Sequence, residues 1–302
     1  MTCIARSIME SVYVEDERGG CLNMLEDAGY YFSPNVQSDH ILNLQNFKAR
    51  SDDVLLVSYP KSGTHWFSEI TTMLIHGYWN LPPETMKHLE YFPANILNEI
   101  PSPRVLNTHL PYPRIPLDFF RKRCKIVVIM RNPRDVAVSY YKFISNLSVW
   151  NYSGHWDSFF PLFLNGNVPY NSWFEHTENW LKVIKSGKHN VHVVFYEDFQ
   201  SDFQDACRKL ADFLEVPCSP ELIDAIHRET SFANMKQNKE DFCLHLSKNG
   251  QSPIYRKGEV GDWQNWFTPE QIDLIDQEME SWGLHTDPRI RCLVDSSSAT
   301  PT

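Results

Sequence analysis

The stretch Asp53-Val-Leu-Leu-Val-Ser-Tyr-Pro-Lys-Ser-Gly-Thr-His-Trp66 decides the fold. It opens with a short apolar run without polar alternation, which is typical of a strand covered on both faces. A turn of small and polar residues follows, and apolar side chains then recur at helical spacing from Trp66 to Gly77. We therefore predict a strand, a tight turn and a helix, which form the first half of a βαβ unit.

Similar patterns recur along the rest of the chain. Further apolar runs predict strands at 104–107, 125–130 and 191–196. Helical spacing predicts helices at about 134–143, 173–184 and 268–282. In the last of these, Thr268, Pro269 and Gln271 suit an N-cap, a first turn and a capping box. Because strands and helices alternate, we predict an α/β fold with a central, mainly parallel β-sheet flanked by helices.

The length of 302 residues suits one large α/β domain. Neither a repeat nor a convincing linker is visible, so we predict a single domain over 1–294. The segment 295–302 is small and polar, and we expect it to form a disordered tail.

Charge limits the classes of partner. Lys and Arg number 28 against 38 Asp and Glu, which gives a net charge of −10. A chain of this charge is not expected to bind nucleic acid or an anionic membrane through its overall field. A phosphate site must therefore be a local basic pocket.

Cysteine usage and hydropathy point to the cytoplasm. The seven cysteines are scattered and form no C-x-x-C pair, which argues against a zinc site and a disulfide framework. The first thirty residues hold no apolar signal segment, and no apolar run reaches the roughly 18 residues of a membrane span. We predict a soluble, cytoplasmic protein with reduced thiols.

The turn after the first strand has the chemistry of an anion site. A helix N-terminus presents unpaired N–H groups, Gly63 allows a close backbone approach, and Lys61 adds a full charge. Ser62 and Thr64 add hydroxyl groups. The lysine precedes the glycine, so the segment is not the G-x-x-x-x-G-K-[ST] loop of ATP and GTP hydrolases. Taken alone, an ordinary strand–helix turn remains the alternative interpretation.

Three other segments carry polar groups to strand ends or loops. Arg131 follows a predicted strand, and arginine binds phosphate in a bidentate manner. Its neighbour Arg134 is expected instead to pair with Asp135 on the surface. The loop 255–263 holds two adjacent cations and two glycines, and His109 lies at the end of another strand. An isolated histidine is more often structural, so His109 gains weight only beside the other motifs.

Together these motifs resemble the cytosolic sulfotransferases. The matching segments, in the family's order and spacing, are Tyr59–Thr64, Thr108–Pro111, Arg131–Tyr141, Phe195–Asp198, Thr230–Phe232 with Met235, Arg256–Gly258 and Gly261–Trp263. The resemblance covers roughly 47–282 and leaves the subfamily unassigned. It implies one α/β domain with a P-loop-like phosphosulfate-binding loop. It also implies transfer of a sulfuryl group from 3′-phosphoadenosine 5′-phosphosulfate (PAPS) to a hydroxyl or amine, with release of 3′-phosphoadenosine 5′-phosphate (PAP) and no metal.

The resemblance assigns a role to each motif. Lys61 would stabilise charge on the leaving group, and His109 would take the proton from the acceptor as general base. Asn107, His109 and Phe143 would contact the acceptor. The residues expected to bind the cofactor are Lys61, Ser62, Gly63, Thr64, His65, Trp66, Arg131, Ser139, Tyr196, Thr230, Ser231, Phe232, Met235, Arg256, Lys257 and Gly258.

Some positions depart from the family pattern. His65 stands where threonine or serine is usual, and Asn107 stands where many members have lysine. The dimer motif K-x-x-x-T-V-x-x-x-E is degraded at Gln264, Pro269 and Asp273. We therefore expect activity at an unknown rate, and a monomer or a weak homodimer.

The acceptor pocket is the least defined part of the site. Candidate aromatic residues are Tyr30, Tyr31, Phe32, Tyr91, Phe92, Phe143, Trp150, Tyr152 and Tyr170, and core packing is the alternative for all but Phe143. Such a pocket would suit a small lipophilic acceptor.

Three other functions compete with sulfate transfer. One is a non-catalytic PAP or lipophilic-ligand binding protein on the same fold. The others are a nucleotide kinase, which the glycine–lysine order disfavours, and a secretory carbohydrate sulfotransferase, which normally begins with a membrane anchor.

Overall fold

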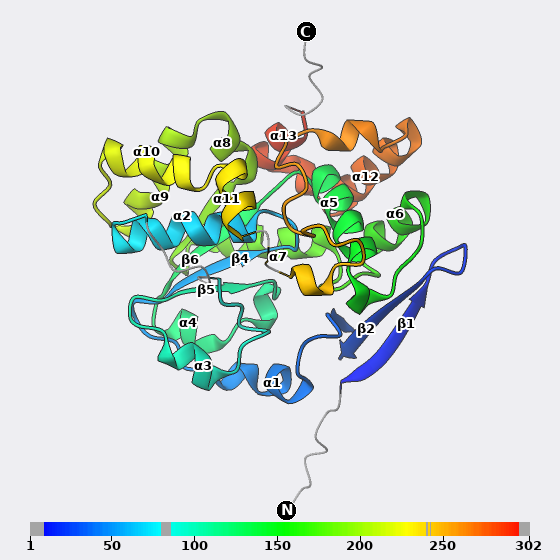
Figure 1. Cartoon of the computed structure of the whole chain (residues 1–302), viewed down its shortest axis with the longest axis horizontal. Coiled ribbons are helices and arrows are strands. Elements are labelled where there is room, and N and C mark those ends of the chain that lie inside the picture. The colour runs from blue at the N-terminus through cyan, green and yellow to red at the C-terminus, as the bar shows by residue number, and fades with distance from the viewer. Residues whose placement is uncertain (1–8, 80–85, 240, 242, 296–302) are drawn as a thin grey trace, which may run out of the picture.

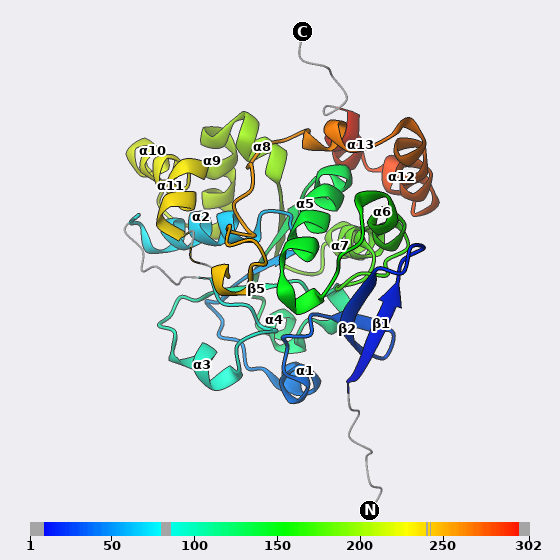
Figure 2. The same cartoon turned by 45° about the vertical axis from the view of Figure 1, so that its right-hand side comes forward.

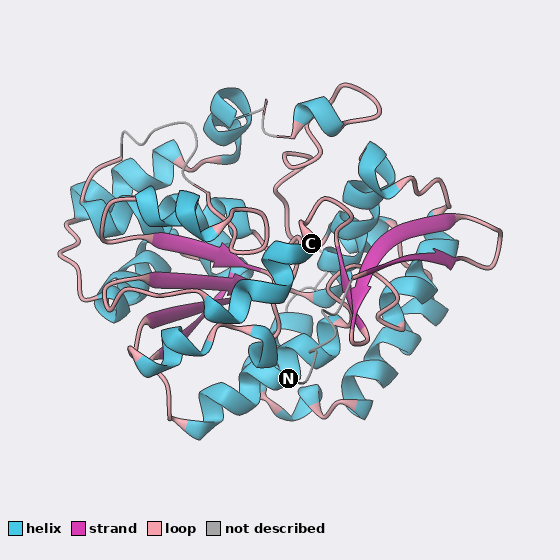
Figure 3. Ribbon diagram, turned by 90° about the horizontal axis from the view of Figure 1, so that it is seen from below, coloured by secondary structure: helices cyan, strands magenta, loops and turns pink. Residues whose placement is uncertain are grey.

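A four-stranded parallel sheet forms the centre of the molecule. The computed structural model describes residues 9–79, 86–239, 241 and 243–295. The strands are β4 (Val54–Ser58), β5 (Val105–Thr108), β6 (Lys125–Met130) and β7 (Val191–Phe195), in the order β5-β4-β6-β7. Figure 3 shows them side by side as the magenta arrows at the left. The predicted parallel sheet is confirmed, with strand ends within one residue of the predicted ones.

Helices cover both faces of this sheet (Figures 1 and 2). The helices are α1 (Ser38–Asn43), α2 (Thr64–His76), α3 (Ala94–Glu99), α4 (Leu117–Arg121), α5 (Pro133–Asn146), α6 (Trp156–Leu164), α7 (Trp173–Ser186), α8 (Tyr196–Ser201), α9 (Phe203–Leu214), α10 (Pro220–Glu229), α11 (Phe232–Lys239), α12 (Pro269–Ser281) and α13 (Pro288–Asp295). Leu55 and Val57 of β4 face a core shared with α5 and α7. Val54 and Leu56 face a second core shared with α2 and α9. Burial on both faces explains why the strand sequence shows no alternation.

A second, antiparallel sheet lies outside the sequence prediction. Its strands are β1 (Glu10–Glu15), β2 (Cys21–Asp27) and β3 (Tyr30–Phe32), in that order (Figure 1). β1 is half exposed and carries glutamate at both ends, so its sequence lacks a strong apolar signal. The backbone N–H of Tyr31 donates to Asn171 Oδ1 at 2.7 Å, which fixes β3 against the main domain.

The expected ends of the last long helix are present. Thr268 Oγ1 accepts a hydrogen bond from the N–H of Gln271, and the Gln271 side chain accepts one from the N–H of Thr268, which forms the capping box. α13 ends at Asp295, where the expected tail begins. Residues 296–302 lie outside the described residues, so the boundary of the domain stays a prediction.

Several large side chains of the helices are buried. Trp173 and Trp180 of α7 are 1% and 0% exposed, so both belong to the core. Arg134 is buried and pairs with Asp276 of α12 at 2.5 Å, so its expected surface pair with Asp135 is wrong. The Asp135 carboxylate instead accepts from the N–H groups of Gly261 and Trp263.

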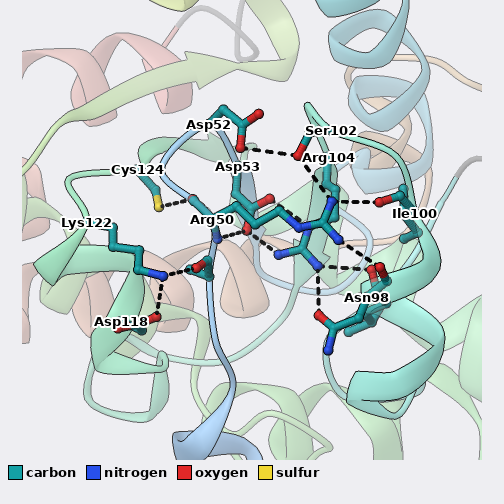
Figure 4. Close-up of polar contacts among 12 residues, drawn as sticks. Arg50, Asp52, Asp53, Asn98, Ile100, Ser102, Arg104, Asp118, Lys122 and Cys124 are labelled. Atoms are coloured by element: carbon teal, nitrogen blue, oxygen red, sulfur yellow. Dashed lines mark hydrogen bonds and ion pairs between the residues drawn. The ribbon is translucent and has the colours of Figure 1, made fainter.

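A buried ion pair joins the beginnings of β4 and β5 (Figure 4). Arg104 binds both carboxylate oxygens of Asp53, at 2.7 and 2.6 Å, and neither side chain is exposed. The remaining Arg104 amino group donates to the carbonyl of Leu97 and to Asn98 Oδ1. Asp53 also accepts from the N–H of Arg50 at 2.7 Å. Since most of its hydrogen-bonding groups have partners, the pair holds the two strands together without leaving its charges uncompensated.

We expect Asp53→Asn to lower the free energy of unfolding by about 3–5 kcal/mol, because it leaves the buried Arg104 charge without its counter-ion. Urea unfolding followed by circular dichroism measures this loss. Lys209→Ala is the control, since Lys209 pairs with Asp205 on the surface at 68% and 49% exposure. The control should leave the free energy of unfolding nearly unchanged, because an exposed ion pair contributes little. Equal losses for the two variants would show that the buried pair has no special role.

Candidate active site

The predicted site residues meet at one edge of the central sheet. Lys61, His109, Arg131 and Tyr196 follow the carboxyl ends of β4, β5, β6 and β7 at intervals of three residues or fewer. Parallel strands place their carboxyl ends at the same edge, where α/β proteins bind ligands. A cavity of about 750 Å³ lies there, and all four side chains line it.

Most of the residues predicted to bind cofactor or acceptor line this cavity. Those lining it are Lys61, Gly63, Thr64, His65, Trp66, His109, Arg131, Ser139, Phe143, Tyr196, Thr230, Ser231, Phe232, Met235, Arg256, Lys257 and Gly258. Ser62 and Asn107 do not line it. Both are fully buried, and the Asn107 side chain donates to Ser68 Oγ in α2 at 3.2 Å. Asn107 therefore lies behind the cavity wall, and its predicted contact with the acceptor stays a prediction.

The turn from β4 into α2 has the shape of an anion cradle. Lys61 and Gly63 both adopt positive φ, 68° and 101°, and α2 begins at Thr64. A Cβ at position 63 would lie 2.8 Å from Cδ2 of Tyr196, so only glycine fits there. Ser58 Oγ and Thr64 Oγ1 share a hydrogen bond of 2.6 Å across the turn. The first N–H groups of α2 thus meet the cavity together with Lys61.

Lys61 is a partly buried cation. Its Nζ lies 4.3 Å from the centre of the Phe143 ring. Burial, together with the charges of the nearby Arg131 and Arg256, lowers the pKa of Lys61 to about 7. The ammonium therefore lacks a full set of polar neighbours, and an anion in the cavity would stabilise its charged form.

His109 has a fixed tautomer. Its Nδ1 lies 2.8 Å from the carbonyl oxygen of Ser58, and a carbonyl only accepts, so Nδ1 carries the proton. The lone pair is then on Nε2. Burial lowers the pKa of His109 to about 4, so the ring is neutral near pH 7. Its backbone N–H donates to Glu90 Oε1 at 2.5 Å, which holds the residue in place.

Arg131, Arg256 and Lys257 form a cluster of cations at another part of the cavity. Arg131 donates to the carbonyls of Lys61 and Glu259, and its guanidinium lies 4.2 Å from the centre of the Tyr196 ring. Its Nε is buried and has no hydrogen-bond partner among the described residues. Arg256 and Lys257 each pair with Asp262, at 2.6 and 2.5 Å.

Aromatic rings lie beside this cluster. Trp66 and Tyr196 are in edge contact, with centroids 5.2 Å apart. Phe232 packs against Gly258, where a Cβ would lie only 2.4 Å from the Phe232 ring, and Gly258 has a φ of 72°. The indole Nε1 of Trp66 is buried without a hydrogen-bond partner among the described residues. The cations, the cradle and these unpaired nitrogens fit a nucleotide that carries more than one anionic group.

His65 and Tyr255 form a contact that sequence reasoning did not find. The Tyr255 hydroxyl lies 2.6 Å from Nδ1 of His65, and both side chains are buried. Burial lowers the pKa of His65 to about 3, with further contributions from Lys239 and Lys61, so this ring is neutral. The contact joins the cradle to the loop that holds Arg256 and Lys257.

The remaining wall of the cavity is largely aromatic. Five of the candidate acceptor residues line it, and these are Tyr91, Phe92, Phe143, Trp150 and Tyr170. Tyr30, Tyr31, Phe32 and Tyr152 do not line it. Instead Tyr152 donates to Asp16 at 2.7 Å, and Phe32 is a core residue of β3. Sequence reasoning also missed His88, which lines the cavity close to His109.

Comparison with known proteins identifies the family. The family model described as "Sulfotransferase domain" matches residues 51–284. Sulfotransferase 1E1 of Bos taurus is 37% identical over 254 residues, covering 79% of this chain and 85% of that protein. Sulfotransferase 6B1 of Danio rerio is 35% identical, covering 78% and 79%. The crystal structure of mouse sulfotransferase SULT7A1 complexed with PAP superposes with a TM-score of 0.78 at 32% identity, covering 91% of this chain and all of that one.

The chain belongs to the sulfotransferase family. The predicted enzyme class and co-substrate are therefore confirmed: it is a PAPS-dependent sulfotransferase. Retinol dehydratase in complex with androsterone and PAP shares the fold, with a TM-score of 0.74 at 21% identity. The subfamily of this sulfotransferase stays unassigned.

Two further findings concern the described part of the sulfotransferase. Within it, no helix has both the length and the apolar character needed to cross a membrane. No group of three metal-ligating side chains occurs among these same residues.

The hydrogen bond between Tyr255 and His65 should stabilise this sulfotransferase. We expect Tyr255→Phe to lower the free energy of unfolding by about 1–2 kcal/mol, because it removes a hydrogen bond between two buried side chains. Chemical denaturation measures the change. Tyr13→Phe is the matched control, since that ring is 68% exposed, and it should change the free energy by less than about 0.5 kcal/mol. A Tyr255→Phe variant as stable as the control would contradict this role.

Proposed function

We propose that this sulfotransferase transfers the sulfuryl group of PAPS to a hydroxyl or amine of a small lipophilic acceptor, with His109 as general base. The observation that carries the proposal is the tautomer of His109. Its Nδ1–H is held by the carbonyl of Ser58, so the Nε2 lone pair is available to accept the acceptor's proton. The same cavity contains Lys61, the residue best suited to stabilise the leaving group.

The cavity is lined by groups of residues that suit different parts of the co-substrate. PAPS supplies the sulfuryl group when bound. We infer that the cradle at Lys61–Trp66 binds its 5′ end, while Arg131, Ser139, Arg256, Lys257 and Gly258 bind its 3′-phosphate. Trp66, Tyr196, Thr230, Ser231, Phe232 and Met235 would enclose the adenine. These assignments are supported by the shared cavity and by the unpaired nitrogens of Arg131 and Trp66.

Sulfuryl transfer moves a proton from the acceptor to His109 and leaves a negative charge on PAP. The acceptor oxygen forms a bond to sulfur as the bond from sulfur to the bridging oxygen of PAPS breaks. The hydroxyl proton passes to Nε2 of His109, and the negative charge that develops on PAP lies near Lys61. A bound anion raises the pKa of a nearby imidazole, so the phosphosulfate would make His109 a stronger base than it is in the ligand-free protein.

A lipophilic acceptor is proposed from the aromatic wall. Phe143, Trp150 and Tyr170 form an aromatic wall of the same cavity, and such walls favour apolar ligands with one or two polar groups. Structures of retinol dehydratase contain androsterone or retinol, so a protein with this fold can hold a small lipophilic molecule. We further propose a cytoplasmic protein that is a monomer or a weak homodimer.

A non-catalytic protein that binds PAP or a lipophilic ligand is the second candidate. Its motivation is His65, a buried neutral ring in the cradle, and Asn107, whose side chain faces away from the cavity. Sulfated product formed by the purified protein from any phenol or steroid alcohol would eliminate this candidate.

Two measurements test the proposed function. We expect PAP alone to raise the thermal stability, by about 2.7 kcal/mol at 100 times its dissociation constant, whereas ATP with magnesium should not. His109→Ala should reduce kcat by about 10²–10⁴-fold and leave the dissociation constant of PAP unchanged. Normal turnover by this variant would remove His109 from the mechanism, and a response to ATP with magnesium alone would favour a kinase.

PAP affinity should depend on pH through Lys61. The pKa of Lys61 is about 7 in the free protein, and a bound anion raises it. Binding therefore requires proton uptake above pH 7, and affinity should fall by up to about tenfold per pH unit between about pH 7 and pH 9. Calorimetry across this range measures the effect. Lys61→Met is the control, and a slope that persists in this variant would assign the proton to another group.

A further inference from the structure

His88 lies beside His109 at the edge of the central sheet. It forms an isolated parallel bridge with Asn107 of β5. The N–H of Leu89 donates to the carbonyl of Asn107 at 2.8 Å, and the N–H of Asn107 donates to the carbonyl of Lys87 at 2.9 Å. Because the backbone on both sides of His88 is tied to β5, its position relative to His109 is fixed by the sheet rather than by a free loop.

The imidazole of His88 is buried in the cavity wall. Its centroid lies 4.7 Å from that of His109, with the two rings tilted by 45°, and the residue is only 7% exposed. Tyr91 meets it edge-on at 5.7 Å. Nδ1 of His88 has no hydrogen-bond partner among the described residues. Because Nδ1 is enclosed by the surrounding protein, a ligand in the cavity would have to contact the other ring nitrogen, Nε2.

Of the other polar side chains near His109, Glu90 does not line the cavity, although its Oε2 is buried without a partner among the described residues. The hydroxyl of Tyr170 donates to that of Tyr91 at 3.1 Å, and Glu90 Oε1 accepts from the backbone N–H of His109. Burial, with His109 and His65 nearby, keeps the pKa of His88 well below its ordinary value, so the ring is neutral. A neutral imidazole has one donor and one acceptor nitrogen. An unpaired acceptor is better tolerated than an unpaired N–H, which favours the proton on Nε2.

We propose that His88 is a specificity-determining residue that donates a hydrogen bond to a second oxygen of the acceptor, next to the hydroxyl that reacts at His109. Two imidazoles side by side suit an acceptor with oxygens on neighbouring carbons. One oxygen loses its proton to His109, and the other accepts a hydrogen bond from His88. The preferred acceptors are therefore phenols with a hydroxyl, ether or carbonyl oxygen at the adjacent position. The inference rests on the proposed function, because it places the reacting hydroxyl at His109.

The test compares 2-methoxyphenol with 2-ethylphenol, which have similar shapes and differ in the adjacent oxygen. Calorimetry on the protein, with and without PAP, gives the dissociation constants, and PAPS-dependent turnover gives kcat/KM. We expect a roughly three- to tenfold preference for 2-methoxyphenol in both the dissociation constant and kcat/KM. This is the effect expected of one neutral hydrogen bond. His88→Phe should reduce this ratio to about one, and His88→Gln, which keeps an N–H donor, should restore part of it.

The control variant is His192→Phe. His192 of β7 stacks on Phe213 with centroids 4.9 Å apart and does not line the cavity, so the ratio should stay as in the unmodified protein. Circular dichroism checks that each variant is folded, and His88→Leu, which also lacks the N–H donor, replaces His88→Phe if that variant is not. Equal use of the two phenols, failure of both to bind, or a preference that survives in His88→Phe would overturn the proposal. Preferential binding without any sulfate transfer would instead contradict the proposed function alone.

Discussion

The buried ion pair between Asp53 and Arg104 is the constraint on which the site depends. It joins the beginnings of β4 and β5, and the two strands then run in parallel register to the opposite edge. Lys61 and His109 follow the ends of these strands. Any slip between β4 and β5 would move the cation away from the imidazole. A salt bridge at one edge of the sheet thus sets the geometry of the chemistry at the other.

Burial is the second organising feature of the site. Desolvation lowers the pKa of Lys61, His65 and His109, and it raises that of Glu90 to about 7. These groups lie in a chain whose net charge is −10, so the basic character of the cavity is local. A low dielectric strengthens the interaction of each cation with a bound anion, so a few cations are sufficient to bind the anion.

The features that were predicted correctly are those that a short segment of sequence determines. The central strands were predictable because burial on both faces leaves unbroken apolar runs, and the cradle was predictable because Lys61 and Gly63 lie in one short segment. The antiparallel sheet was missed because β1 is half exposed. The inward orientation of Asn107 and the contact of His65 with Tyr255, 190 residues away, depend on tertiary packing and leave no local signal. His88 was missed for the same reason.

Asp262 already neutralises two of the cations to which a phosphate is proposed to bind. It pairs with both Arg256 and Lys257. A phosphate that binds there as proposed would replace an internal carboxylate rather than dissolved counter-ions. Such an exchange would release few counter-ions to the solvent, so this contact would contribute little to the ionic-strength dependence of binding.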